Sequence, residues 1–397
     1  MSLRQPNANI YTLLSGFCLF FMALGVNRFA YTPVIPFLVH EHWLTHSQAG
    51  YVAGANLLGY FVGALIAHKF NQIIHPRILM VSLLCLYVIA TSACIFDFGF
   101  WWLKTWRFIL GLNNGIIMIM TPSLILANLS ESQKAITSGI MFSGIGAGAF
   151  ICSLLIPFFF SWGGVSDIWL GLAILTLFSC LVSLKKCLNA LPQKRKSLHS
   201  YHSLTSYQRK HLLLALTGYF LYSIGSTPSL LFLSVYAHHT LGTSLAISSY
   251  LFSLFGIGCA LGAISAGVIH HKLNNYFAVV LTSLIGIISI LLMIWIPSVT
   301  WLVICTFFSG YYLMAMVTLM SLFVGQLIGI SLHAKYWSLM TLSYASSQFI
   351  ATYTYSYGLS LNLNYVTLFK IGALALTLSL VCYLCLPKTI NTQESSQ

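Results

Sequence analysis

Long, unbroken apolar runs recur along this chain, and they constrain its fold more than any other feature. Residues 276–296, for example, contain no charged side chain, and a helix of about 20 residues spans the hydrocarbon core of a bilayer. Of the 397 residues, 58% are hydrophobic and only 6% are charged, whereas a soluble domain usually carries about 25% charged residues. Only helices and closed barrels satisfy all backbone polar groups in lipid, and these runs lack the alternation of barrel strands. The sequence therefore predicts an all-α polytopic membrane protein.

Twelve such runs follow one another, and we expect each to form a transmembrane helix. The predicted spans are residues 11–38, 47–67, 78–97, 100–128, 135–158, 167–184, 211–237, 245–269, 276–296, 299–328, 335–358 and 365–386. The stretch "SYASSQFIATYTYSYGLSLNLNY", which covers most of span eleven and the loop after it, is unusually polar. No A-x-A cleavage site ends the first run, so we expect it to stay in place as span one.

Lysine and arginine are distributed unevenly between the two sides of this bundle. Cytoplasmic loops carry an excess of these residues. With the N-terminus in the cytoplasm, the inner side would hold Arg4, Lys69, Arg77, Lys134, Lys185, Lys186, Lys194, Arg195, Lys196, Arg209, Lys210, Lys272, Lys335 and Lys388. Only Lys104 and Lys370 would lie at the outer side. We therefore expect a protein integral to the cytoplasmic (inner) membrane with both termini in the cytoplasm. The net charge of +13 then reflects this bias and does not indicate a nucleic-acid-binding protein.

The longest polar stretch, "PQKRKSLHSYHSLTSYQRKH", lies between spans six and seven. We interpret residues 185–210 as a basic cytoplasmic linker between an N-terminal half, residues 1–184, and a C-terminal half, residues 211–397. Basic residues beside a membrane are attracted to anionic lipid headgroups, so the lipid bilayer is the expected partner of this linker.

Two glycine pairs indicate that the halves are repeats. Gly59 and Gly63 in span two correspond to Gly258 and Gly262 in span eight, each 199 residues later. Glycines at this spacing let two helix backbones approach closely. A general richness of membrane helices in glycine would explain either pair alone, but not their matched positions. We therefore expect two pseudo-symmetric six-helix halves, an arrangement found in secondary transporters.

The ten cysteines indicate neither a disulfide framework nor a cofactor. Nearly all lie inside predicted spans, where a buried cysteine behaves as a small apolar residue. Cys382 and Cys385 form a CxxC pair, but they do so in the apolar last span. The outer segment "HEHWLTH" holds three histidines, which are usually solvated in an exposed loop. We expect no metal ion and no cofactor.

Several segments resemble the major facilitator superfamily. "RFILGLNNG" in span four is similar to its Arg-x-x-x-Gly pattern through Arg107 and Gly111, and "GIMFSGIGAGAFICSLLIP" resembles its Gly-rich fifth-helix motif without the usual Gly-Pro pair. "GVNRFAYTPVIPFL", "AGYVAGANLLGYFVGALIA", "WRFILGLNNG" and "SWGGVSDIWLGLAILTLF" resemble the YbfB/YjiJ-type branch. The first cytoplasmic loop, "GALIAHKFNQIIHPR", departs from the superfamily pattern, with Ala67 at the position of an acid. The resemblance implies the major facilitator fold and a transporter, without a defined substrate.

In that superfamily, spans one, four, seven and ten line a central cavity, and three of these spans carry a Thr-Pro pair here. The pairs end in Pro33, Pro122 and Pro228. Proline removes a backbone donor and bends a helix, and membranes tolerate such breaks where neighbours or cavity water satisfy the backbone. Hinges at these prolines are one interpretation. The general frequency of proline in membrane helices is the other.

Two arginines lie within spans, where charge is costly. Burying an arginine at the centre of a membrane helix costs about 2.5–3.5 kcal/mol on insertion scales. Arg28 would lie roughly 15 Å, and Arg107 roughly 10 Å, from the outer ends of their spans. Arg107 shares a helix face with Gly111 and Asn114. No Asp or Glu lies deep in any predicted span, so the sequence offers these cations no buried acidic partner.

Three interpretations of the arginines remain open. They would bond backbone carbonyls as structural residues, attract an anionic or carboxylate-bearing substrate through the guanidinium fork, or, in one case, extend to the outer surface. Tyrosines on spans seven and ten would supply the opposite wall of a substrate site. The substrate-binding candidates are therefore Arg28, Tyr31, Arg107, Asn114, Tyr219, Tyr222, Tyr311 and Tyr312. The hinge or packing candidates are Pro33, Gly59, Gly63, Gly111, Pro122, Pro228, Gly258 and Gly262.

These patterns favour a monomeric secondary transporter that moves a small organic solute by alternating access. A membrane receptor or scaffold without transport is one alternative, but no polar stretch exceeds the central linker in length. An intramembrane enzyme is another, but the chain has neither a G-x-S-x-G nor an H-E-x-x-H motif. The sequence does not indicate the coupling ion or the direction of transport.

Overall fold

The computed structural model describes residues 10–126, 131–189 and 204–388, and within these ranges the fold is all-helical. The elements up to the central linker are α1 (Ile10–Phe20), the π-helical segment η1 (Phe21–Phe29), α2 (Tyr31–His40), α3 (His46–Ile73), α4 (Pro76–Ala93), α5 (Phe100–Leu126), α6 (Glu131–Gly163) and α7 (Val165–Leu188). Those after it are α8 (Ser206–Leu231), α9 (Leu233–His239), α10 (Leu245–Leu273), α11 (Asn275–Trp295), α12 (Val299–Ile328), α13 (Ile330–Ser360) and α14 (Tyr365–Leu384).

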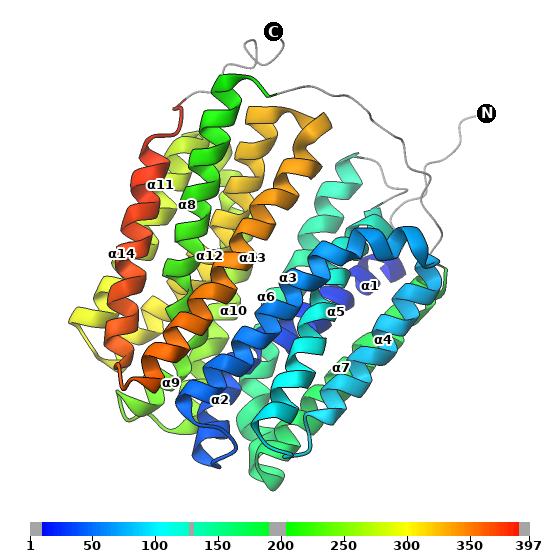
Figure 1. The fold of residues 1–397 in the computed structure, drawn as a ribbon, viewed down its shortest axis with the longest axis vertical. Helices are drawn as coiled ribbons and strands as arrows, with labels where there is room; N and C mark the ends of the chain where they lie inside the picture. Colours follow the sequence, from blue (N-terminus) through cyan, green and yellow to red (C-terminus); the bar gives the residue numbers. More distant parts are fainter. Residues whose placement is uncertain (1–9, 127–130, 190–203, 389–397) are drawn as a thin grey trace.

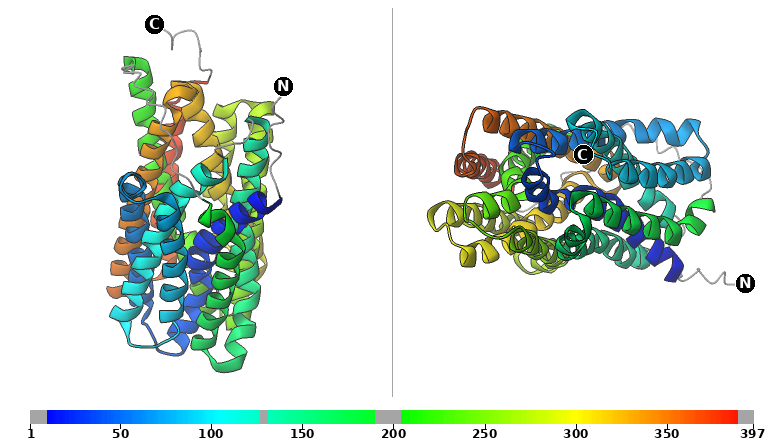
Figure 2. Two further views of the ribbon diagram at one scale, coloured as in Figure 1. Left: turned by 90° about the vertical axis from the view of Figure 1, so that its right-hand side faces the viewer. Right: turned by 90° about the horizontal axis from the view of Figure 1, so that it is seen from below.

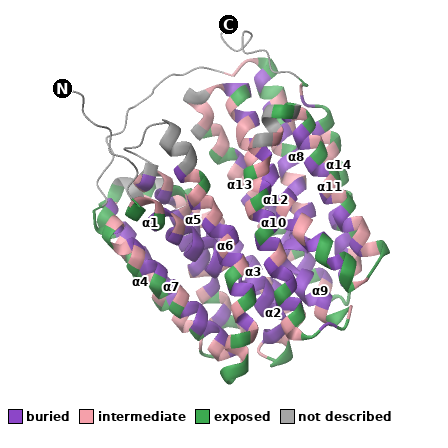
Figure 3. Cartoon of the chain, turned by 180° about the vertical axis from the view of Figure 1, so that it is seen from behind, coloured by how far each residue is buried: buried purple, intermediate pink, exposed green. Residues whose placement is uncertain are grey.

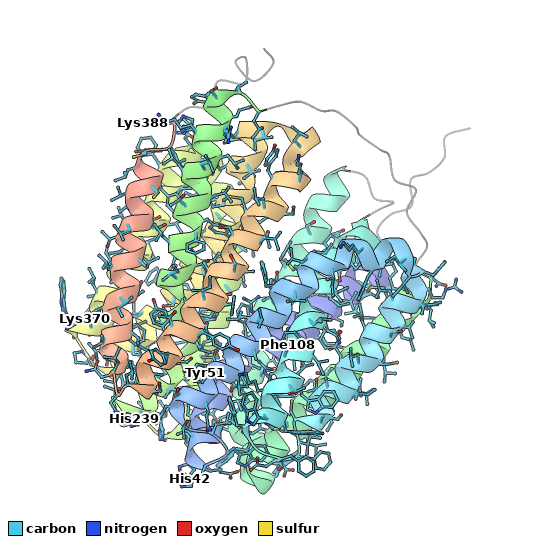
Figure 4. The ribbon with its side chains drawn as sticks, in the orientation of Figure 1. His42, Tyr51, Phe108, His239, Lys370 and Lys388 are labelled. Atoms are coloured by element: carbon cyan, nitrogen blue, oxygen red, sulfur yellow. The ribbon has the colours of Figure 1, made fainter. Side chains whose placement is uncertain are left out.

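The helices form two groups that lie side by side. Figure 1 shows α1–α7 gathered on one side of the molecule and α8–α14 on the other, and Figure 2 shows the same elongated bundle from its side and from one end. Figure 4 labels Lys388 at one end of the bundle and His42, His239 and Lys370 at the other. We call these the Lys388 end and the His42 end.

The described helices are those of a membrane protein. Nine spans among these residues are long and apolar enough to cross a membrane, and there are ten if the bent pair α8 and α9 forms one span. The first, Ile10–His40, joins α1, η1 and α2. Helices α5 and α13 are outside this set, so the total of twelve spans stays a prediction. Buried polar side chains such as Gln348 and Thr352 lower the hydropathy of α13.

Burial is concentrated in the interior of the bundle and leaves apolar side chains on the outside. Figure 3 shows buried residues concentrated within the bundle. Phe178 and Ile264 are 63% and 64% exposed, and they belong to a large set of exposed apolar residues. In water so extensive an apolar surface would promote association, whereas lipid tails cover it without cost.

The repeated glycines lie at two equivalent helix crossings. A Cβ atom on Gly63 in α3 would lie 2.1 Å from the carbonyl oxygen of Leu112 in α5. One on Gly262 in α10 would lie 2.2 Å from that of Tyr311 in α12. The corresponding distances to a carbonyl oxygen are 2.1 Å at Gly59, 1.9 Å at Gly111, 2.0 Å at Gly258 and 2.0 Å at Gly310. Gly310 follows Gly111 by the same 199 residues, so the repeat extends to both partners of each crossing.

Leucine at either crossing should prevent close packing of its helix pair. We expect Gly63→Leu and Gly262→Leu each to remove most of the monodisperse protein in size-exclusion chromatography, because overpacking typically costs about 1–3 kcal/mol and here the obstacle is backbone. Gly267→Leu is the matched control, since it lies on the same helix as Gly262 and a Cβ atom there meets nothing within 4 Å. Equal recovery of all three variants would show that these crossings tolerate bulk.

Candidate functional site

The first span is interrupted before its proline. The backbone of η1 is π-helical from Phe21 to Phe29, and the N–H of Ala30 donates to the carbonyl of Gly25, five residues back, at 3.0 Å. Pro33 has no N–H to donate to Phe29, which releases the end of η1 from the regular α-helical pattern. Such π-segments inside helices occur frequently at functional sites. The expected break near Pro33 is therefore a π-segment on its N-terminal side, and this segment carries Arg28.

Arg28 links the two groups of helices. Its Nη2 donates to Oε1 of Gln348 in α13, and its guanidinium lies over the ring of Tyr60 in α3, 4.8 Å from the centroid. Arg28 is half-buried, and its Nε finds no hydrogen-bond partner within the described part of the chain. A neutral amide and an aromatic face thus take the place of an acid beside this cation.

A cavity of about 110 Å³ opens beside Arg28 between the two groups. Its lining comes from η1, α5, α8 and α12, which correspond to spans one, four, seven and ten, and also from α3, α6 and α13. The lining residues are Leu24, Arg28, Phe29, Tyr60, Met118, Phe142, Ile145, Tyr219, Leu230, Leu313, Met314, Val317, Trp337, Thr341, Tyr344 and Gln348. Among these described residues, only Arg28 is charged.

Arg107 has a different environment from Arg28. It is 1% exposed, its Nη1 donates to the carbonyl of Asn27 at 2.8 Å, and its guanidinium lies 4.4 Å from the centroid of the Tyr31 ring. A second void of about 30 Å³ is lined by Arg107, Tyr31 and Arg28 and also by residues of α8 and α13 such as Thr227 and Gln348. Arg107 therefore contacts residues of the first group and faces this small void together with Arg28, but it is absent from the wall of the larger cavity.

The other substrate-binding candidates separate into one that lines the cavity and several that pack behind it. Tyr219 lines the cavity. Asn114 accepts a hydrogen bond from the Tyr87 hydroxyl at 2.7 Å, and Tyr222 donates to the carbonyl of Tyr312 at 2.7 Å. Tyr311 forms the α10–α12 crossing, and its hydroxyl accepts from Ser265 at 2.8 Å. Asn114, Tyr222, Tyr311 and Tyr312 are absent from the lining.

The three Thr-Pro positions are structurally unlike one another. Helices α8 and α9 bend by 43° at Phe232, four residues after Pro228. The hydroxyl of Tyr355 donates at 3.1 Å to the Ile224 carbonyl, which Pro228 cannot bond. Pro122 lies inside α5, which continues to Leu126. A bend is thus present in span seven and a π-segment in span one, while a hinge function for the three prolines stays a prediction.

Helix contacts close the space between the two groups on the His42 side of the cavity. Gly50 precedes Tyr60 on α3, and a Cβ atom on it would lie 2.0 Å from Oγ of Ser356 in α13. At the level of the cavity, where the neighbouring Ile145 lines the wall, helices α6 and α10 also meet, since a Cβ atom on Gly146 would lie 2.8 Å from the carbonyl oxygen of Gly256. These contacts join helices of the first group to helices of the second.

Comparison with known proteins gives the family. The family model described as "Uncharacterised MFS-type transporter YbfB", where MFS denotes the major facilitator superfamily, matches residues 20–384. The chain belongs to this family. The "Uncharacterized MFS-type transporter YceJ" of Bacillus subtilis (strain 168) is 20% identical over 263 residues, which are 64% of this chain and 65% of that relative. The match thus spans about two thirds of the relative's own length.

A solved transporter has the same fold as this MFS-type transporter. The match is titled "Crystal Structure of A Bacterial Homolog to Human Lysosomal Transporter, Spinster, in Inward-facing And Unoccupied Conformation", with a TM-score of 0.68 and 15% identity, and it covers 95% of this chain and 94% of that one. The predicted major facilitator fold is therefore confirmed, as is the resemblance to the YbfB-type branch. Family and fold are those of membrane transporters, not of enzymes.

Sequence reasoning missed the cavity residues of this transporter that lie outside spans one, four, seven and ten. Tyr60 comes from α3, and Trp337, Tyr344 and Gln348 come from α13. One signal could have found the last two, because the unusually polar stretch that begins at Ser343 contains both. A lipid-facing or purely packed helix has no need of so many buried polar groups. Within the described ranges, no three His, Cys, Asp or Glu side chains gather as a metal site would require.

Proposed function

We propose that the protein is a secondary transporter that moves a small organic solute bearing an anionic, carboxylate-type group by alternating access. The observation that carries this proposal is Arg28, the one charged side chain among the described residues that line the cavity. Its guanidinium bonds a neutral amide, that of Gln348, and not an acid. A cation without an opposite charge in a site of low dielectric is costly, and an anionic solute would supply that charge.

The cavity walls favour a compact solute with one anionic group and an apolar body. Tyr60, Trp337 and Tyr344 present aromatic rings to it, and its volume of about 110 Å³ is below the range of about 300–1,000 Å³ typical of drug-sized ligands. A guanidinium fork binds both oxygens of a carboxylate. A single arginine in such walls suits a monoanion better than a multiply charged solute.

The position of the inter-group contacts supports alternating access. Contacts such as Gly50 with Ser356 lie between the cavity and the His42 end, and the solved transporter of similar fold is titled inward-facing. We infer that this conformation is closed at the His42 end. Residues 1–184 and 211–397 would move as two bodies joined by the linker 185–210, within a functional monomer.

Uptake into proteoliposomes tests the proposed function. The purified protein is reconstituted, and accumulation of radiolabelled compact monocarboxylates is compared with that of their uncharged amide and cationic amine analogues. We expect saturable uptake of one or more carboxylates and none of the matched amides or amines. Saturable uptake confined to the amines or amides would refute an anionic substrate, and absence of uptake across the whole panel would count against transport of compact anions.

The proposed orientation places the Lys388 end in the cytoplasm of a cell whose inner membrane holds the protein. Basic residues such as Lys185, Lys186 and Lys388 favour this assignment. A cysteine at exposed Thr240 should react with an impermeant thiol reagent in intact cells, and one at exposed Asn189 only after permeabilisation, each measured against the parent chain. The reverse pattern would invert the topology.

A further inference from the structure

Three side chains from three helices meet at the His42 end, away from the cavity. The rings of His46 in α3 and His239 in α9 are 4.9 Å apart in an edge-to-face contact. The hydroxyl oxygen of Tyr365 in α14 is 2.7 Å from Nδ1 of His46. His46 belongs to the first group of helices, and the other two residues belong to the second. The cluster therefore bridges the seam between the two groups, at the end where Figure 4 labels His239.

The medium at this end reaches the imidazoles. His239 is exposed, His46 is half-buried and Tyr365 is buried. A tyrosine hydroxyl that donates to Nδ1 of His46 fits a neutral imidazole, because a protonated ring has no free acceptor nitrogen. With the hydroxyl as donor, His46 is uncharged, and its edge-to-face contact with the His239 ring then places no two like charges together.

Few opposite charges are available near the cluster. Other titratable groups at this end, on the elements packed around it, include His40, Glu41, His42, Tyr51, Tyr236, His238, Tyr353, Tyr357 and Lys370. Lys104 of α5 lies over the Tyr353 ring, 5.9 Å from its centroid. Glu41 is the one acid among these described residues, and it accepts a hydrogen bond from the backbone N–H of Val165 in α7 at 3.1 Å. Nδ1 of His238 is 2.7 Å from the Thr243 carbonyl oxygen. A charge on His46 thus meets basic or neutral groups and no free acid.

We propose that His46, His239 and Tyr365 form a proton-binding site that favours opening of the His42 end when the medium there becomes acidic. Histidine ordinarily changes charge near pH 6.5, and protonation of both rings places two like charges in direct contact across the seam. The charges separate only if the two groups of helices move apart. Protons therefore bind more tightly to the open state, and this difference in affinity shifts the population toward it.

This inference rests on the proposed alternating access and adds a proton-sensitive control of that cycle. No Asp or Glu lies deep in any predicted span. The carboxylate that an intramembrane proton relay commonly uses is therefore missing from these spans. A histidine pair at the outer seam would make the transport cycle sensitive to external protons without a buried carboxylate. The bend between α8 and α9, which positions His239, gives this contact an element able to move.

A buried cysteine in the seam reports opening at this end. Ser356→Cys replaces a fully buried side chain that lies under Gly50, and it changes the side chain by one atom. Its rate of reaction with an impermeant thiol reagent is measured at pH 7.5 and 5.5, in the native background and together with His46→Gln and His239→Asn. At each pH, the rate with native histidines is divided by the rate with both histidines substituted, which cancels the effect of pH on the thiol itself. The parent chain without Ser356→Cys is labelled in parallel, and its rate is subtracted to correct for native cysteines.

We expect the ratio of rates, native histidines over substituted, to rise about tenfold between pH 7.5 and pH 5.5. His42→Asn is the matched control, because this exposed histidine has a φ of 60°, which asparagine also adopts readily. With His42→Asn as the substituted chain, the ratio of rates should be the same at both pH values. With His46 and His239 substituted, a ratio that is equal at both pH values would overturn the proton site, whatever its size. Failure of the proposed function appears separately, as absence of carboxylate uptake by the native protein.

Discussion

Replacing Arg28 by glutamine will reduce affinity for the transported anion by about 100-fold and leave the fold intact. Hydrogen bonds to charged groups contribute about 1.5–3 kcal/mol, and about 1.4 kcal/mol corresponds to a tenfold change in affinity. Arg28→Lys should lose about tenfold, because lysine keeps the charge but lacks the planar fork. The measurement is the solute concentration that gives half-maximal uptake in proteoliposomes. Glutamine can still bond Gln348, so folding should persist.

Arg107→Gln is the informative comparison for the Arg28 series. Its side chain donates to a buried carbonyl, that of Asn27, and covers the ring of Tyr31. Hydrogen bonds to charged groups contribute about 1.5–3 kcal/mol, and the shorter, neutral glutamine loses both this charged bond and the cover over Tyr31, so the variant should lower the yield and melting temperature of the protein. If Arg28→Gln unfolds the protein equally, Arg28 is a structural residue. If Arg28→Gln and Arg28→Lys transport like the native chain, Arg28 does not bind the substrate.

A glutamate at position 348 should hold the transporter closed at the His42 end. Gln348 accepts from Arg28 across the two groups of helices, so Gln348→Glu turns a neutral contact into an ion pair. The new carboxylate would compete with the substrate anion for the guanidinium, and separating a buried pair costs several kcal/mol. We expect uptake to fall by at least about tenfold, the melting temperature to rise, and Ser356→Cys labelling to slow in this background.

Gln348→Leu separates the effect of the charge from that of the lost hydrogen bond. Leucine removes the link between the groups and adds no competitor for Arg28, so labelling of Ser356→Cys should accelerate, not slow. Should Gln348→Glu transport as well as the native chain, the Arg28–Gln348 contact would be no part of the gate.

The two glycine crossings show what sequence periodicity can predict. Only glycine allows a carbonyl oxygen at about 2 Å from the position that a Cβ atom would take, as at Gly63 and Gly262. Both glycines could be recognised in the sequence because they occupy equivalent positions of the repeat, 199 residues apart. Such packing involves one helix pair, so the glycines that allow it recur at a regular spacing of four residues in the sequence. The four cavity-lining spans came instead from the resemblance to the superfamily, and Arg28 and Tyr219, on two of these spans, line the cavity.

The partners of Arg28 could not be predicted in the same way. Gln348 lies 320 residues away on a helix outside the four expected to line the cavity, and no local pattern encodes such pairing. Arg28 and Arg107 appeared equivalent because helix depth follows from counting residues. Their environments differ in the contacts that each guanidinium makes. Arg107 donates to the carbonyl of Asn27 and stacks on the ring of Tyr31, whereas Arg28 lines the cavity and bonds Gln348.

A thermal-shift series on the native protein tests the central claim most directly. Compact monocarboxylates and their isosteric amides are compared at equal concentration, with Arg28→Gln measured in parallel. If Arg28 holds an anionic substrate, one or more carboxylates will raise the melting temperature of the native protein, their amides will not, and Arg28→Gln will lose the response. If carboxylate and amide stabilise the protein equally, or if Arg28→Gln keeps the response, the anion site at Arg28 is contradicted.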